Sequence, residues 1–484
     1  MSLVPDVPAR DQRLFLSLAA VVSLATWEAR VSAASPAWTA QHFSTGAGFH
    51  HTLAVGDLNG DGFLDVAIAN SAASAVTVLL GNGDGTLAPH QTHAALGQPQ
   101  DVQMADLTGD GVLDLATPDY AGSGVAVLRG LGNGTFAPPV AYATGPGLVS
   151  LAVVDLDGDA RLDLAVTKEA GSSIAVLPAL AAGGFGTAVQ VATGAIPHQI
   201  NTADLDHDGR PDLIVTNHGA AAASVHLGNG TFMPGAATPF PAGAAPIGLT
   251  LADLNLDGDA DLLVSNVNAA TVSVLLGNGD GTFASPVAYP TDPRPRGMDA
   301  GDLDGDGVPE VVIATGYPDG DSVLNVYRGR ADGTLEIFAH FDLPYRAADC
   351  VVADLNGDTH PDIVATGPQA GVVSVLLNPG GTLGVPDPPA VATHPQLRVA
   401  PNPARSSVTF RFLSPAGAGA TLEILDLAGR RVARLGTVSD GLDWRSATWR
   451  GELGNGERAA PGLYLVRLRS ADDVVTRRVM LLPR

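Results

Sequence analysis

Oxygen-bearing side chains recur in this sequence at short, odd spacings. In the segment that begins at Asp57 they occupy positions 1, 3, 5 and 9, as Asp57, Asn59, Asp61 and Asp65. In a tight loop, alternate side chains converge on one point, where the main-chain carbonyl of position 7 can join them. Calcium is a hard cation that takes roughly six to eight oxygen ligands, whereas magnesium prefers fewer protein ligands and a stricter octahedron. The spacing therefore predicts a calcium site.

The pattern occurs seven times, and half of the chain's 50 acidic residues lie in these loops. The predicted calcium ligands, loop by loop, are Asp57, Asn59, Asp61 and Asp65; Asp106, Thr108, Asp110 and Asp114; Asp155, Asp157, Asp159 and Asp163; Asp204, Asp206, Asp208 and Asp212; Asp253, Asn255, Asp257 and Asp261; Asp302, Asp304, Asp306 and Glu310; and Asp354, Asn356, Asp358 and Asp362. So many carboxylates would repel one another without cations. Because all ligands come from the protein, we expect a structural metal. Solvated Asp-rich turns are the alternative.

Three loops depart from the common pattern. Glycine permits a sharp bend at position 6 of the other loops. Ala160 and Thr359 take its place in the third and seventh loops, and Thr108 at position 3 leaves the second loop with one carboxylate or amide fewer. We expect these three sites to bind calcium more weakly.

The loops recur at a nearly constant interval along the chain. Their first residues are Asp57, Asp106, Asp155, Asp204, Asp253, Asp302 and Asp354, so five intervals measure 49 residues and the last measures 52. In the fifth unit, the apolar run 247–252 precedes the loop, and residues 262–265, 272–276 and 286–290 follow as further short apolar segments. Asn-Gly and Asp-Gly steps between them supply hairpin turns. Each unit is therefore predicted to form four short strands.

A four-stranded unit cannot bury both of its faces alone, whereas seven packed radially can. The sequence thus predicts an all-β protein, a seven-bladed β-propeller over residues 38–386. Residues 38–46 match the fourth strand of a unit but precede the first complete one. We expect them to complete the last blade, whose other strands come from residues 345–383, because closure removes an exposed edge. An open β-solenoid is the rival architecture.

The aspartate loop followed by Gly-Asn-Gly-Asp-Gly-Thr-Phe, as at residues 277–283, resembles the FG-GAP repeat, also described as a VCBS repeat. Such repeats occur in integrin α-subunit propellers and in many secreted bacterial proteins. The resemblance covers roughly residues 38–386. It implies the fold and calcium binding, up to seven structural ions, and it does not imply a substrate.

The N-terminal segment predicts that the protein is secreted. Arg10 and Arg13 precede the apolar run 14–25, and small residues follow at 31–33, so residues 1–33 are predicted to be a cleaved secretory signal peptide. A short buried helix or an uncleaved anchor is the alternative. No other segment is long and apolar enough to cross a membrane. The net charge of −24 repels nucleic acid and anionic membrane.

A second pattern begins after a proline-rich linker at residues 387–397. Short alternating strands over residues 398–484 favour a small immunoglobulin-like β-sandwich. Pro-Asn-Pro at 401–403, Asp-Leu-Ala-Gly-Arg at 426–430 and Ala-Pro-Gly-Leu-Tyr at 460–464 resemble the immunoglobulin-like domain of the flagellar hook-capping protein and type IX secretion sorting tails. The resemblance implies contact with the secretion machinery and a place outside the outer membrane of a Gram-negative-type bacterium. A plain sandwich module is the alternative.

Irregular residues on this regular scaffold mark a candidate ligand surface. Four positions before each loop the residue is apolar, and Cys350, the single cysteine, is one of these, so it is predicted to be buried and inert. Three and five positions before the loop, small or polar residues face the other way. The rim away from the loops has the ligand-binding candidates His51, Gln100, Tyr120, His198, Arg296 and Tyr317, with Asp119 and Asn217 nearby. Solvated loop residues are the alternative.

No serine elbow, phosphate-binding loop, dinucleotide fingerprint or zinc motif is present, and no catalytic residue is assigned. The regularly placed aspartates belong to the metal loops, which leaves no named acid and base for glycoside hydrolysis. The preferred hypothesis is a secreted or surface-displayed adhesion and recognition module for a glycan or a protein. A secreted polysaccharide lyase or glycosidase on the same scaffold, and a structural envelope component, are the alternatives.

Overall fold

In a computed structural model, the described part of the chain is almost entirely β-structured, with one short 3-10 helix, η1 (Glu169–Gly171). The structure describes residues 38–46, 48–122, 124–316, 322–343, 345–367, 371–380, 396–400, 408–413, 420–426, 430–435, 438–439, 445–453, 458–460, 462–470 and 473–481. The predicted signal peptide and most of the predicted linker lie outside these ranges. No helix in the described part of the chain is long and apolar enough to cross a membrane.

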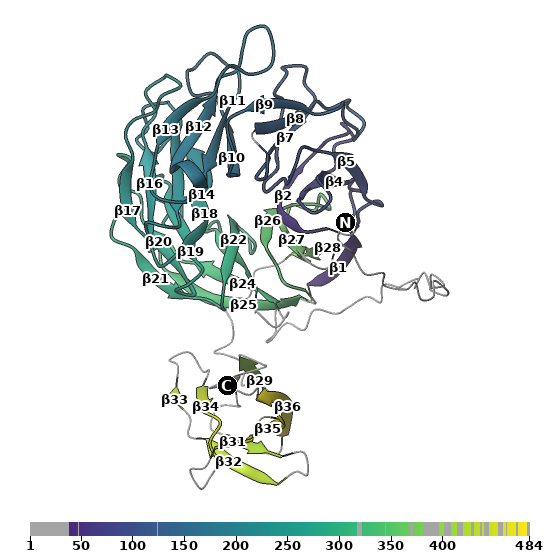
Figure 1. Ribbon diagram of the computed structural model, residues 1–484, viewed down its shortest axis with the longest axis vertical. Helices are drawn as coiled ribbons and strands as arrows, with labels where there is room; N and C mark the ends of the chain where they lie inside the picture. Colours follow the sequence, from purple (N-terminus) through teal and green to yellow (C-terminus); the bar gives the residue numbers. More distant parts are fainter. Residues whose placement is uncertain are drawn as a thin grey trace, which may run out of the picture.

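Seven four-stranded antiparallel sheets follow one another around a central axis (Figure 1). The first three blades comprise β2 (His50–Gly56), β3 (Asp65–Asn70), β4 (Ala75–Leu79) and β5 (Gln91–Ala94); β6 (Gln103–Ala105), β7 (Asp114–Pro118), β8 (Gly124–Leu128) and β9 (Val140–Ala143); and β10 (Leu148–Val154), β11 (Asp163–Lys168), β12 (Ser173–Leu177) and β13 (Val189–Ala192). The next three comprise β14 (Pro197–Ala203), β15 (Asp212–Asn217), β16 (Ala222–His226) and β17 (Thr238–Pro241); β18 (Pro246–Ala252), β19 (Asp261–Asn266), β20 (Thr271–Leu275) and β21 (Val287–Pro290); and β22 (Pro295–Gly301), β23 (Glu310–Gly316), β24 (Ser322–Gly329) and β25 (Leu335–Leu343).

The seventh blade joins the two ends of the ring. Its sheet has the order β1-β28-β27-β26, in which β26 (Asp349–Ala353), β27 (Asp362–Gly367) and β28 (Val372–Leu377) come from the last repeat and β1 (Thr39–Ser44) from the start of the described chain. Strand β1 runs antiparallel to β28, with Thr39 opposite Leu377 and Ser44 opposite Val372. The predicted closure is confirmed.

Side chains from three segments lock this closure. The His42 Nδ1 atom in β1 lies 2.6 Å from the Ser374 Oγ atom in β28. The buried Tyr345 hydroxyl also donates to that Ser374 oxygen. Trp38, just before β1, packs against Phe341 of the sixth blade, with the two ring centroids 5.2 Å apart. The closing strand is thus held by polar and aromatic contacts as well as by its ladder.

The core lies between the blades. Seven hydrophobic clusters each combine buried side chains of two neighbouring blades, including one that joins the sixth blade to the seventh and one that joins the seventh to the first. An open solenoid would lack the last contact. The second strand of each blade is buried along almost its whole length, because neighbouring blades cover both of its faces, whereas the fourth strand alternates toward solvent. Cys350 lies in one of these clusters and is buried as predicted.

The C-terminal segment forms two further four-stranded sheets. One has the order β29-β30-β34-β33 and the other β32-β31-β35-β36. Their strands are β29 (Gln396–Ala400), β30 (Val408–Leu413), β31 (Ala420–Leu425), β32 (Arg431–Leu435), β33 (Val438–Ser439), β34 (Arg445–Trp449), β35 (Gly462–Ser470) and β36 (Asp473–Leu481). A single hydrophobic cluster contains Phe410 and Trp449 from one sheet and Ile424 and Val466 from the other. The immunoglobulin-like assignment of this segment stays a prediction.

Candidate metal-binding loops and the opposite rim

Each aspartate loop connects the innermost strand of a blade to the buried second strand. Position 9 is the first residue of that second strand, as Asp65 is of β3 and Asp212 of β15. The loops therefore recur at the same end of all seven blades, as the fixed repeat spacing predicts.

The position-9 carboxylate holds the blade together. Asp65 is fully buried, its Oδ2 atom accepts the Leu58 N–H at 2.8 Å, and its Oδ1 atom accepts the Gly81 N–H, also at 2.8 Å. The same pair of bonds recurs at Asp114, Asp163, Asp212, Asp261 and Asp362. This carboxylate thus ties the metal loop to the turn between the third and fourth strands. The sequence pattern assigned it to the metal alone and missed this second role.

The loop backbone wraps around the remaining carboxylates. Asp57 Oδ1 accepts the Gly60 N–H at 2.7 Å, and its Oδ2 atom accepts the Gly62 N–H at 2.8 Å. Asp61 Oδ1 accepts the Phe63 N–H at 2.9 Å. Gly62 needs its φ of +87° to make this bend, and Ala160 and Thr359 adopt φ values of +66° and +74° at the same position. A left-handed backbone is strained for non-glycine residues, and the weaker calcium binding expected of these loops stays a prediction.

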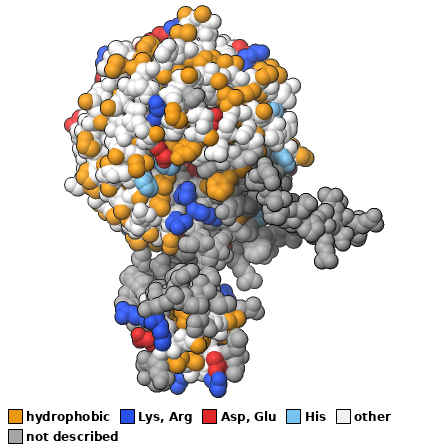
Figure 2. All heavy atoms as spheres, in the orientation of Figure 1, with side chains coloured by type: hydrophobic (Ala, Val, Ile, Leu, Met, Phe, Trp, Pro, Cys, Tyr) orange, Lys and Arg blue, Asp and Glu red, His pale blue; other side chains and the backbone are white. Residues whose placement is uncertain are grey.

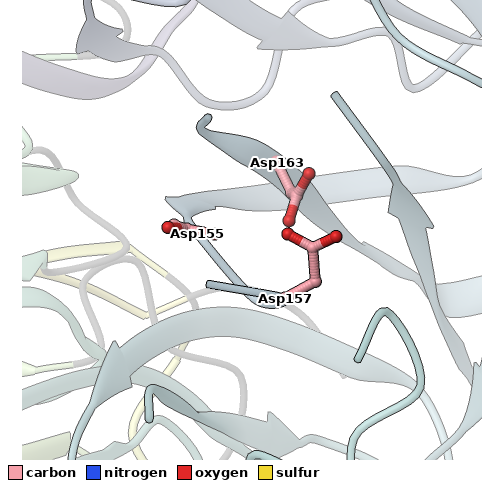
Figure 3. Close-up of side chains that lie close together, drawn as sticks. All are labelled: Asp155, Asp157 and Asp163. Atoms are coloured by element: carbon pink, nitrogen blue, oxygen red, sulfur yellow. The ribbon is translucent and has the colours of Figure 1, made fainter. Parts of the chain in front are cut away.

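Three loops bring carboxylate oxygens close enough to share one cation. The oxygens lie within 4.8 Å of one another in the groups Asp155, Asp157 and Asp163; Asp204, Asp206 and Asp212; and Asp302, Asp304 and Asp306. Figure 3 shows the carboxylates of Asp157 and Asp163 facing each other in the third loop. An all-oxygen donor set of this kind fits a hard divalent cation. Several aspartate clusters of this protein could therefore hold metal ions.

Burial and mutual repulsion act on the same carboxylates. Burial raises the pKa of Asp65, and the nearby charges of Asp61 and Asp57 raise it further, against the two backbone hydrogen bonds. Burial likewise raises the pKa of Asp362 to about 6 and, together with the charge of Asp304, that of Glu310 to about 8. A bound cation would neutralise these charges and so lower the free-energy cost of burying several carboxylates together. The electrostatics therefore also fit a metal.

Basic side chains contact several loops from outside. Arg210 Nη1 lies 3.0 Å from Asp208 Oδ2, and Arg161 makes the corresponding contact with Asp159. Arg328 of β24 contacts Asp304 and lies 4.0 Å from Glu310 Oε1. The first two arginines occupy position 7 of their loops, so the sequence contains a signal for them. Arg328 reaches the sixth loop from another strand, and the repeat pattern does not predict this contact.

The ligand-binding candidates lie at the opposite end of the innermost strands. Gln100, His198 and Arg296 occupy equivalent positions of three blades, each six residues before its loop. The main-chain carbonyls of His198 and Arg296 accept hydrogen bonds from Thr167 and Ser265 of the preceding blades, at 2.6 Å each. Because this hydrogen bond uses only the main-chain carbonyl, the side chain at this position can differ from blade to blade. We call this surface the rim.

The other rim candidates differ in what the structure says of them. Tyr120 is exposed, and its hydroxyl lies 3.3 Å from Glu169 Oε2. Asp119 is buried and accepts the Gln98 and Gly122 N–H groups, and Asn217 is buried and donates to Ser224, so both residues shape turns. The side chain of His51 and all of Tyr317 lie outside the described residues.

Polar residues on the axial face of the innermost strands link neighbouring blades. Asp101 accepts the Thr52 hydroxyl at 2.8 Å from the preceding blade and the Ser150 hydroxyl at 2.7 Å from the following one. Asp349 Oδ2 accepts the Leu53 N–H at 3.2 Å. Burial, and then the charges of Asp101 and Asp299, raise the pKa of Asp349 to about 7. The sequence predicts only that Asp101 and Asp349 face away from the core. In the structure, both residues join neighbouring blades by hydrogen bonds.

Comparison with known proteins identifies the repeats. A family model described as FG-GAP-like repeat matches residues 57–117, 118–166, 204–264 and 257–313. These matched segments lie within the first six blades of the β-propeller. A search of curated proteins found no significant match.

Solved structures of similar shape have low sequence identity. The periplasmic gluconolactonase of Pseudomonas aeruginosa is 16% identical, with a TM-score of 0.45, over 82% of this chain and 99% of that one. A functionally unknown protein from Desulfotomaculum acetoxidans is 13% identical, with a TM-score of 0.44, over 66% of this chain and 89% of that one.

Proposed function

We propose that this protein is a calcium-stabilised propeller that works outside the cell as a recognition module for a glycan or another protein. The observation that carries the proposal is the division between the two ends of the blades. One end repeats the same carboxylate loop seven times, and the other end varies from blade to blade. Repetition suits a structural role, and variation on a rigid scaffold suits recognition.

Calcium is the metal we propose for the loops. The donors are carboxylate, amide and main-chain oxygens in flexible loops, which match its preference for many oxygen ligands. The raised pKa values of the buried position-9 carboxylates mark the cost that the cation would remove. Up to seven ions would then hold the loops, with Arg328 already supplying one positive charge to the sixth. These ions would stabilise the ring, and we assign them no substrate.

The rim is the surface we propose for the ligand. Its innermost positions share one backbone arrangement but hold side chains as different as Gln100, His198 and Arg296. Tyr120 adds an exposed aromatic ring, and aromatic and arginine side chains supply much of the affinity at recognition sites. Tyr317 belongs to this proposal on the basis of its place in the sequence.

Secretion completes the proposal. The signal-like segment at residues 1–33, the FG-GAP-like repeats and the sorting-like motifs of the C-terminal segment all fit a protein outside the cell. The C-terminal segment would contact the secretion machinery, and the propeller would remain free to bind.

A glycan array probed with the calcium-loaded protein, followed by titration calorimetry on the best ligand, tests the proposed function. The Tyr120→Ala, Arg296→Ala and Tyr317→Ala triple variant should lose binding but keep the calcium affinity and melting temperature of the wild type. Undiminished binding by the folded triple variant would move the ligand site away from the rim. Turnover of a polysaccharide by the wild type would replace recognition by the enzyme alternative.

A further inference from the structure

Three arginines gather on the rim where the sixth and seventh blades meet. Arg294 and Arg346 lie at equivalent positions of the two blades, each eight residues before its aspartate loop, and Arg296 lies in β22 beside them. The same position in the first five blades holds Phe49, Gln98, Gly147, Ile196 and Ala245. The basic group is therefore a local departure from the repeat. Figure 2 shows blue side chains gathered on the visible face of the propeller, over the region that Figure 1 labels β22 and β24.

These arginines differ from the other basic residues of the propeller in their partners. Residues 38–386 contain nine Lys and Arg side chains. Five of the other six contact a carboxylate, and Lys168 donates to Thr144 and Gln190. Within the described ranges, Arg294, Arg296 and Arg346 form no ion pair, and the Nε atoms of Arg296 and Arg346 are buried without a hydrogen-bond partner. Buried donors without acceptors are costly, and the described residues supply none to these two Nε atoms, so the arrangement suits an added acceptor.

The electrostatic environment supports the same reading. Burial, and then the charges of Arg346 and Arg294, lower the pKa of Arg296 to about 10. Burial and the charge of Arg294 lower the pKa of Arg346 as well. The Arg346 side chain lies directly over Gly316, the last residue of β23, where a Cβ atom would come within 2.7 Å of its Cγ atom. The Gly297 N–H donates to the Ala348 carbonyl at 3.0 Å, and this backbone hydrogen bond places the segments that carry Arg296 and Arg346 side by side.

We propose that Arg294, Arg296 and Arg346 form an oxyanion site that binds the carboxylate or sulfate group of an acidic sugar. Guanidinium groups bind both oxyanions through paired N–H bonds, and an anion between them would remove the repulsion and the unpaired donors together. The rest of the molecule selects against dense polyanions, because its net charge is −24. A sugar with one anionic group among neutral hydroxyls satisfies both conditions. This inference rests on the proposed recognition function and names the chemistry of its ligand.

Titrations of the full calcium-loaded chain with glucuronate, glucose 6-sulfate and glucose, at constant ionic strength, test the site. Both acidic sugars should bind and raise the melting temperature by mass action, whereas glucose should not. Arg296→Gln with Arg346→Gln should weaken binding of the acidic sugars by at least about tenfold. The exposed Arg294→Gln variant, whose folding is not in question, should weaken it by a smaller factor. Arg330→Gln, which removes a charge paired with Glu336 elsewhere on the sixth blade, is the matched control and should bind as the wild type does.

The outcomes separate this inference from the proposed function. Equal binding of glucose and glucuronate, or equal binding by the double variant and the control, would overturn the oxyanion site. If a neutral glycan binds at the rim and no acidic sugar does, the recognition function survives and the oxyanion site fails. A glutamate-rich peptide that binds more tightly than either acidic sugar would overturn the assignment to a sugar.

Discussion

At the scale of single residues, the carboxylates of one loop do different work. Asp65 is buried and accepts two backbone N–H groups, whereas Asp61 is exposed and accepts the Phe63 N–H and the side-chain amide of Asn59. Replacing Asp65 by Ala should therefore lower the free energy of unfolding by about 2–4 kcal/mol even in the presence of a chelator, because two buried donors lose their acceptor. Replacing Asp61 by Ala should affect mainly the calcium-dependent part. Denaturant unfolding of both variants, with calcium and with EDTA, measures the difference. An equal loss in the two variants under EDTA would contradict the structural role of Asp65.

Asp349 predicts a pH dependence. Its buried carboxyl has a pKa of about 7, above the ordinary value of 3.8, so the folded state retains a proton that the unfolded state releases. The contribution of the protonated Asp349 carboxyl to the free energy of unfolding is complete below the unfolded pKa and is lost as the pH rises through about 7. Asp349→Asn stays neutral at every pH, so its advantage over the wild type in melting temperature should already exist at pH 5, grow as the pH rises to about 7, and level off above that pH at a few degrees.

The control for this pH series is Asp84→Asn. Asp84 is exposed, and its hydrogen bonds with Thr86 lower its pKa, so it is charged throughout the series in both folded and unfolded chains. Melting curves from pH 5 to 8.5 should thus run parallel for wild type and Asp84→Asn and diverge for Asp349→Asn. Parallel curves for all three proteins would show that Asp349 is charged in the fold.

At the scale of elements, strand β1 carries the closure of the ring. Deleting residues 39–44 would expose the edge of β28 and leave the seventh blade with three strands. An open edge is a template for pairing with another chain. We expect the deletion to lower the melting temperature by several degrees and to cause self-association, measured by light scattering after size-exclusion chromatography. A monomer with the wild-type melting temperature would contradict the closure.

The C-terminal segment makes a separate prediction at this scale. Among the described residues, its hydrophobic cluster contains no propeller residue, and the propeller clusters contain none of its residues. A chain that ends at Pro386 should therefore still fold and bind calcium. In its native host it should accumulate in the periplasm, as fractionation and immunoblotting would show. Normal appearance of the shortened chain at the surface or in the medium would refute the sorting role.

Repetition explains which elements the sequence could predict. Seven equal units make the blade count, the loop positions and the unmatched strand at residues 38–46 readable, because each unit repeats the same local chemistry. The partners of Asp65, the approach of Arg328 to the sixth loop and the bonds of Asp101 between blades depend on segments that are distant in sequence. Local spacing contains no record of those contacts. The assembly of Arg294, Arg296 and Arg346 likewise required two blades to be placed side by side.

At the scale of the whole molecule, the account rests on cations that stabilise a strongly acidic ring. Seven Ca²⁺ ions would change the formal net charge from −24 to −10. At about 1 mM calcium and site constants of about 10⁻⁴ to 10⁻³ M, each site adds roughly 0.4 to 1.4 kcal/mol. Independent sites would together contribute a few to about ten kcal/mol, a large share of the stability of an ordinary domain. Calcium should therefore be among the main determinants of stability.

The thermal unfolding of the full chain in calcium, in excess EDTA and in magnesium after EDTA tests this claim most directly. Chelation should lower the melting temperature by about ten degrees or more, and calcium should restore it. Magnesium should restore it poorly, because it prefers fewer protein ligands and a stricter octahedron. Calorimetric titration of the chelated protein gives the number of bound ions. A melting curve that does not change in excess EDTA would contradict the account.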